Sequence, residues 1–120
     1  MDHEELVAAC HCGKARIEIS RRPDYINECN CSLCARSGWR GIYFASDELV
    51  IQGEFDRYVR TDLQQPCIAI LRCATCGCFT HWVPLSEPPY DRMGVNARLV
   101  DPALLQGIEV REIDGKSWDG

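Results

Sequence analysis

Two short stretches decide the fold: residues 10–13 (Cys-His-Cys-Gly) near the start of the chain, and residues 73–77 (Cys-Ala-Thr-Cys-Gly) beyond its middle. Each brings two cysteines together and ends in a glycine, which can adopt a positive φ and turn its amides towards the sulfurs, as in zinc-ribbon knuckles. Four thiolates complete the tetrahedral shell of Zn²⁺, and such sites contribute about 10 kcal/mol or more to folding. The alternative is a set of free or redox-active thiols. We predict a structural zinc bound by Cys10, Cys12, Cys73 and Cys76.

A third stretch, residues 29–34 (Cys-Asn-Cys-Ser-Leu-Cys), offers three thiolates within one tight turn. Such soft ligands select zinc over magnesium or calcium, and zinc with three protein ligands keeps one position for water, hydroxide or an incoming thiolate. The alternative is a fourth ligand that closes the site, with Cys67, Cys78 and His81 as candidates. Both cysteines are interpreted more simply as small buried hydrophobes. We predict an open zinc site with the ligands Cys29, Cys31 and Cys34.

Composition restricts the possible partners. A chain of 120 residues predicts a single domain over residues 1–120. The net charge of -5, with Arg21-Arg22 as the longest basic cluster, disfavours nucleic acid. A membrane span needs about 20 apolar residues, and the run over residues 67–71 is too short. The acidic residues 1–5 lead into no apolar stretch, so we expect no secretory signal.

With neither a signal nor a membrane span expected, we expect a cytoplasmic protein. A reducing cytosol keeps thiols free and makes metal ligation commoner than disulfide formation, and the odd count of nine cysteines fits that interpretation. A disulfide framework is the alternative for a secreted chain. The close Cys-x-Cys spacing argues against it, because that geometry suits a metal better than a local bridge.

Hydrophobic patterning predicts short strands separated by turns. Residues 15–19 alternate apolar and charged side chains, as a half-buried strand does, and directly follow the first cysteine pair. The other predicted strands are 41–45, 49–52, 57–60, 68–72, 80–83, 94–97 and 108–113. Residues 32–37 are predicted to form a turn of helix, and residues 85–91 a long loop. The pattern is that of an all-β domain.

The three cysteine stretches, with Trp82 behind the last of them and residues 95–98 (Val-Asn-Ala-Arg), resemble the glutathione-dependent formaldehyde-activating enzyme family, which shares a domain with the centromere protein V group. The resemblance extends from about Leu6 to Asp114. It implies a mainly β, Mss4-like or β-tent fold of short antiparallel strands with zinc-ribbon-like knuckles. It also implies two zinc ions, one structural and bound by the four-cysteine set, and one catalytic and bound by the three-cysteine set. The reaction of the family joins formaldehyde to the sulfur of glutathione and is classed with the carbon–sulfur lyases.

We therefore expect the open zinc to bind a small thiol, with glutathione as the first candidate, and to lower its pKa so that an aldehyde can add at sulfur. The oxygen of the adduct needs a proton. The candidate catalytic residues, as donor or orienter, are His81, Asn96 and Arg98. The planar guanidinium of Arg98 also suits a carboxylate of the tripeptide. The plainer alternatives are a structural histidine on a strand and a solvated arginine.

Several aromatic residues come after the three cysteines of the open site in the sequence. Trp39, Tyr43, Phe44 and Trp82 are candidates to line its pocket, although aromatic residues in strands are more often core residues.

Two rival functions remain at this point. One is a zinc-ribbon-like binding module without turnover, in which both metals are structural and an exposed face holds a partner protein. The other is a thiol-redox role for Cys67 and Cys78.

Overall fold

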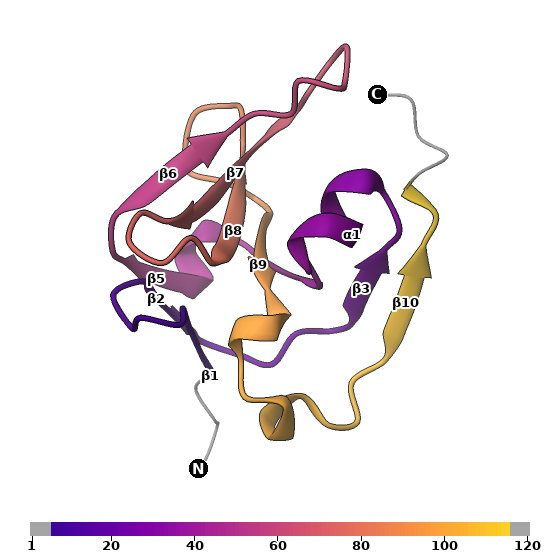
Figure 1. Ribbon diagram of the computed structural model, residues 1–120. Coiled ribbons are helices and arrows are strands. Elements are labelled where there is room, and N and C mark those ends of the chain that lie inside the picture. Colours follow the sequence, from indigo (N-terminus) through magenta and orange to yellow (C-terminus); the bar gives the residue numbers. More distant parts are fainter. Residues whose placement is uncertain (1–5, 116–120) are drawn as a thin grey trace.

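The computed structural model describes residues 6–115, and residues 1–5 and 116–120 lie outside the described part. The described residues form ten short strands, one α-helix and three 3₁₀ helices. The strands make two sheets (Figure 1). The mainly β, Mss4-like fold is thereby confirmed. Within residues 6–115 no helix is long and apolar enough to cross a membrane.

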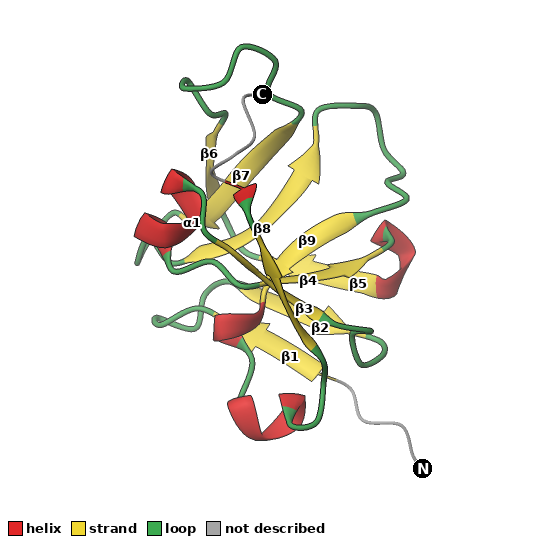
Figure 2. Ribbon diagram, turned by 90° about the vertical axis from the view of Figure 1, so that its right-hand side faces the viewer, coloured by secondary structure: helices red, strands yellow, loops and turns green. Residues whose placement is uncertain are grey.

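The smaller sheet is antiparallel and has three strands, in the order β1 (Leu6–Ala9), β2 (Arg16–Ile19) and β5 (Leu49–Gln52). The turn between β1 and β2 contains Cys10 and Cys12, so the first cysteine pair lies at a strand end, as predicted. In Figure 2 this sheet lies at the lower end of the molecule, and β6 and β7 of the other sheet lie at the upper end.

The larger sheet has seven strands, in the order β10 (Val110–Ile113), β3 (Ile26–Cys29), β4 (Gly41–Phe44), β9 (Met93–Asn96), β8 (Phe79–Pro84), β7 (Ile68–Cys73) and β6 (Phe55–Tyr58). Its neighbours are antiparallel except β10 and β3, which pair in parallel. This pair is an exception to the expected antiparallel strands. A parallel neighbour needs a crossover connection, and residues 97–109 supply it with the 3₁₀ helices η2 (Ala97–Leu99) and η3 (Pro102–Leu105).

The only α-helix of the described chain, α1 (Ser32–Ser37), has the bounds that the sequence predicts. It begins because the Cys31 sulfur accepts the backbone N–H of Cys34, at 3.4 Å, and so caps the first turn. It ends at Gly38, whose φ of 75° is left-handed. The helix therefore starts at one cysteine of the predicted open site and carries another.

The main core lies between the two sheets. Leu6 and Ile17 of the smaller sheet pack there with Ile42, Phe44 and Val95 of the larger sheet. Strand side chains alternate between faces, so Tyr43, between two core residues of β4, points to the opposite face of the larger sheet. Asn27, whose side chain donates to Tyr43 Oη, lies on the same outer face.

Most predicted strands are confirmed to within one or two residues, and 49–52 has the predicted bounds. The strand predicted at 57–60 is observed two residues earlier, at 55–58. The strands β1 and β3 were not predicted, because each has four residues and neither shows a clean alternation of apolar and charged residues. Residues 85–92 form a long loop before β9, and 46–48 form the 3₁₀ helix η1 (Ser46–Glu48).

Candidate metal centres

The first centre is the four-cysteine cluster. The sulfurs of Cys10, Cys12, Cys73 and Cys76 lie within 4.8 Å of one another. Cys12 Sγ lies 3.6 Å from Cys10 Sγ and 3.7 Å from Cys73 Sγ. Tetrahedral zinc with Zn–S bonds of about 2.3 Å requires sulfurs about 3.8 Å apart. The sulfur spacing therefore fits a tetrahedral metal ion such as Zn²⁺.

Each of the two turns that build this cluster ends in a glycine with left-handed backbone geometry. Gly13 and Gly77 have φ angles of 83° and 82°, as the sequence predicts. Their N–H groups donate to the carbonyls of Cys10 and Cys73, at 3.1 and 2.9 Å. The buried Cys10 sulfur accepts the N–H of Ala15 at 3.2 Å, and that of Cys73 accepts the N–H of Cys76 at 3.5 Å. Amides aimed at sulfur favour the thiolate form that a metal requires.

One thiol of this cluster is acidic even in the absence of a metal. Hydrogen bonds from the backbone N–H groups of Cys78 and Cys12 lower the pKa of Cys76 to about 5. A thiolate is thus present at neutral pH to begin binding a cation.

The second centre is the three-cysteine cluster. Its ligands come from consecutive local elements: Cys29 ends β3, Cys31 caps α1, and Cys34 lies in the first turn of α1. Their sulfurs lie within 4.8 Å of one another. No other His, Cys, Asp or Glu of residues 6–115 joins this group, so the proposed fourth ligands, Cys67, Cys78 and His81, do not close it.

Arg60 supplies a positive charge to the three-cysteine cluster, and the sequence analysis missed it. Its Nη1 donates to Cys31 Sγ at 3.6 Å. Asp62 fixes the guanidinium through two hydrogen bonds, of 2.9 and 2.6 Å, and the Arg60 side chain is only 15% exposed. Burial opposes ionisation of Cys31, but the N–H of Cys34, hydrogen bonds with its neighbouring thiols and the charge of Arg60 together lower its pKa. An Arg-x-Asp pair in a loop gives no sequence signal, because such pairs are common on surfaces.

Gly115 lies against the same cluster from the other end of the described chain. A Cβ atom at this position would collide with Cys29 Sγ and lie 3.2 Å from Cys31 Cβ. Glycine is therefore the residue that allows this backbone to approach the sulfurs so closely.

A polar group lies on the outer sheet face near the cluster. Asn27 precedes Cys29 by two residues on β3, so both side chains point to the same side. Its Nδ2 donates to Tyr43 Oη at 3.1 Å, while its buried Oδ1 has no hydrogen-bond partner in the described chain. Burial raises the pKa of Tyr43, although Asn27 and Arg92 oppose the rise, and the charge of Cys34 adds to it. The Tyr43 phenol is thus protonated at neutral pH.

The aromatic candidates fall into two groups. Trp82 lies beside Tyr43 on the outer face, with ring centroids 6.1 Å apart. Phe44 belongs to the core, and Trp39 is buried against Phe79 with centroids 5.0 Å apart.

His81 is 2% exposed and lies inside the fold on β8. Its Nδ1 is 2.8 Å from Thr80 Oγ1, which donates its own proton to the carbonyl of Leu71. Nδ1 of the neutral ring therefore carries the proton and donates it to Thr80. Burial lowers the pKa of His81 to about 4, so the ring is neutral at physiological pH.

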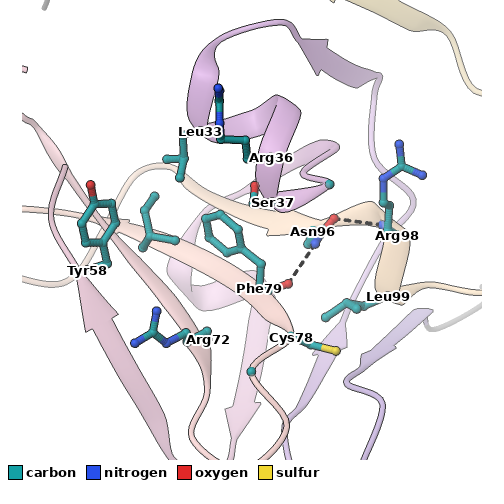
Figure 3. A pocket seen from close by; sticks show the side chains of 13 residues that line it. Leu33, Arg36, Ser37, Tyr58, Arg72, Cys78, Phe79, Asn96, Arg98 and Leu99 are labelled. Atoms are coloured by element: carbon teal, nitrogen blue, oxygen red, sulfur yellow. Dashed lines mark hydrogen bonds between the residues drawn. The ribbon is translucent and has the colours of Figure 1, made fainter. Parts of the chain in front are cut away.

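Asn96 and Arg98 lie together, beside a cavity (Figure 3). Asn96 is 3% exposed, and its Oδ1 accepts the N–H groups of Arg40 and Arg98, while its Nδ2 donates to the carbonyl of Phe79. The Arg98 side chain is exposed. In the described part of the chain, neither these two residues nor His81 hydrogen-bonds to the three-cysteine cluster.

The remaining cysteines differ from their expected environments. Cys67 is exposed rather than buried, because it lies at the end of the 59–67 loop, before β7 begins. Cys78 is half-buried beside the four-cysteine cluster. All nine cysteines lie within residues 6–115, and none forms a disulfide.

Comparison with known proteins agrees with this description. The family model for the glutathione-dependent formaldehyde-activating enzyme matches residues 5–107. A crystal structure of a Rhodobacter sphaeroides protein superposes with a TM-score of 0.62 and 25% identity, covering 87% of this chain and 98% of that one. A search of curated proteins finds no match to the chain.

Proposed function

The chain belongs to the glutathione-dependent formaldehyde-activating enzyme family, and we propose that it is a zinc-dependent enzyme of the carbon–sulfur lyase type. In this proposal a small thiol, with glutathione as the first candidate, binds at Cys29, Cys31 and Cys34 and adds to an aldehyde such as formaldehyde. The observation that carries the proposal is the contrast between four gathered sulfurs in one cluster and three in the other.

We propose zinc as the metal of both clusters, structural in the first and catalytic in the second. Thiolates are soft ligands that select zinc over the hard cations, and the sulfur spacing of the four-cysteine cluster fits it. A zinc ion at the three-cysteine cluster would lower the pKa of a thiol placed beside it.

In the reaction, the substrate thiol releases its proton to water, an electron pair of the resulting thiolate forms a bond to the carbonyl carbon, and the π electrons of the carbonyl move to its oxygen, which takes up a proton. Arg60 holds Cys31 through its hydrogen bond and offsets the negative charge of the clustered thiolates. The Tyr43 hydroxyl accepts a hydrogen bond from Asn27, so its own proton is available to the new oxygen.

We propose different roles for the three residues that the sequence predicts as catalytic. Arg98, which is exposed, remains the proposed partner of a carboxylate. For Asn96 and His81 we propose positioning roles, because their polar contacts hold the backbone around η2 and the β8 strand respectively.

The test is the rate of addition of glutathione to ¹³C-formaldehyde, measured by NMR exchange at equilibrium with the zinc-loaded protein. We expect the wild type to accelerate exchange, Cys31→Ser to abolish the acceleration, and Cys67→Ser, an exposed cysteine outside both clusters, to leave it unchanged. Native mass spectrometry of the same samples counts the zinc ions and detects a glutathione adduct.

The same experiment separates the enzyme from a zinc-ribbon-like binding module. A wild type with two zinc ions, no adduct and no acceleration would favour the module over the enzyme. A single zinc ion in the wild type would contradict the two-site proposal itself.

A further inference from the structure

A cavity of about 510 Å³ lies between α1 and the outer face of the larger sheet (Figure 3). Leu33, Arg36 and Ser37 of α1 form one wall, whereas none of the cluster ligands Cys29, Cys31 and Cys34 lines it. The volume is within the range of about 300–1,000 Å³ that is usual for small-molecule sites. The cavity therefore provides a binding space that does not include a metal ligand.

The cavity is positively charged in an acidic protein. Arg36, Arg72 and Arg98 come from three different elements and surround the Phe79 ring in Figure 3. Among the described residues that line the cavity there is no Asp or Glu, although the whole chain has a net charge of -5. Such a concentration of one sign raises the local concentration of the opposite ion.

These three charges are weakly neutralised within the protein. Over residues 6–115 Arg98 makes no ion pair, and Arg36 donates only to the backbone carbonyl of Ser32, at 3.2 Å. Arg72 approaches Asp56 at 3.8 Å, with both side chains more than half exposed, and such pairs contribute little. All three guanidinium groups can therefore turn to a ligand.

The floor between the charges is apolar and is held in place. Phe79 lies between the arginines in Figure 3, and Ile70 also lines the cavity. Asn96 bonds both the carbonyl of Phe79 and the N–H of Arg98, so it links the floor to the rim. In the wall, Ser37 Oγ is buried and has no hydrogen-bond partner in the described chain. An unpaired buried hydroxyl is uncommon and is satisfied when a ligand supplies the partner.

We propose that this cavity binds a small organic anion that carries two or more oxyanion groups on an apolar body. The oxyanions contact Arg36, Arg72 and Arg98, and the apolar body covers Phe79 and Ile70. Planar guanidinium groups match carboxylate, phosphate and sulfonate oxygens. This site shares Arg98 with the proposed function but does not depend on it, since anion binding here requires neither metal nor turnover.

The test uses 1,5-naphthalenedisulfonate, a planar dianion without a thiol, titrated into the zinc-loaded protein by calorimetry at low and high salt. We expect Arg36→Gln with Arg98→Gln to weaken binding at least tenfold. The control is Arg16→Gln with Arg111→Gln, which makes the same change in net charge at exposed sites outside the cavity. Arg98→Gln should fold normally, because Asn96 holds the backbone of this residue and not its side chain.

Cys31→Ser should bind the probe as the wild type does, so that a failure of the proposed function leaves this result unaffected. If glutathione displaces the probe, the carboxylates of glutathione are the oxyanions that the site binds. If glutathione does not displace it, the site binds another dianion. Absence of probe binding to the wild type, equal weakening in the control pair, or loss of binding in Cys31→Ser would each overturn the proposal.

Discussion

The two cysteine clusters offer the same ligand atom, the cysteine Sγ, but their ligands span very different lengths of sequence. The four-cysteine cluster joins the β1–β2 turn of the smaller sheet to the turn after β7 of the larger sheet. The three-cysteine cluster comes from six consecutive residues between β3 and α1. A metal in the first therefore holds distant parts of the fold together, whereas a metal in the second binds to a turn that local hydrogen bonds already shape. We therefore expect the number of ligands and the chain distance that they span to distinguish a structural metal centre from the catalytic one that we propose.

The largest expected difference is between Cys73→Ser and Cys31→Ser. Cys73→Ser should lose its cluster metal and its cooperative unfolding transition, because structural zinc contributes on the order of 10 kcal/mol. Cys31→Ser should lose one metal and keep its far-UV circular dichroism spectrum. Denaturant unfolding with metal counting by native mass spectrometry measures both. Equal collapse of the two variants would mean that both clusters are structural.

The loss of stability in acid also bears on the comparison of the two clusters, because His81, which lies outside both, contributes to it. The folded pKa of His81, about 4, lies below the ordinary value of 6.5, so the unfolded chain binds more protons between these values. Its contribution to stability is complete above about pH 6.5 and is lost as the pH falls towards 4. The loss is about 3 kcal/mol by pH 4. Unfolding of the wild type and His81→Gln across this range measures it. Parallel curves would show that His81 does not contribute to the acid lability.

Gly115→Ala tests whether the three-cysteine cluster also depends on residues that are far away in the sequence. The added Cβ would displace Cys29 Sγ, and overpacking of this kind costs about 1–3 kcal/mol. We expect weaker binding of one zinc ion in competition with a chelator, and no effect on the other. The control, Gly107→Ala, adds a methyl group to open space at a φ of 84°, so it should lower stability without changing metal affinity. An unchanged affinity in Gly115→Ala would make the cluster a purely local structure.

The smallest expected effect belongs to Arg60→Gln. Removal of the guanidinium takes away the hydrogen bond to Cys31, and partners of ligands typically account for about tenfold in metal affinity or somewhat more. The four-cysteine cluster should be unaffected. Arg57→Gln, in the neighbouring strand and exposed, is the matched control. If both variants bind zinc equally well, Arg60 neutralises charge without supporting the metal.

Local pattern accounts for what the sequence correctly predicted. Three features depend on short-range geometry, so they can be predicted without knowledge of the fold. They are the ligand pairs with one or two residues between them, the glycines at 13 and 77, and the helix over residues 32–37. The short strands β1 and β3 could not be read in this way, because tertiary pairing and not alternation defines them.

By itself the sequence determined the seven candidate ligands, their division into four and three, the mainly β class and the family. Only the tertiary structure decided what surrounds the ligands. It brought Arg60 and Gly115 to the three-cysteine cluster, buried His81 and Asn96, and gathered three arginines around one cavity. The physical reason is that these contacts join residues far apart in the chain, whose spacing carries no periodic signal and is set only when the two sheets and α1 pack together.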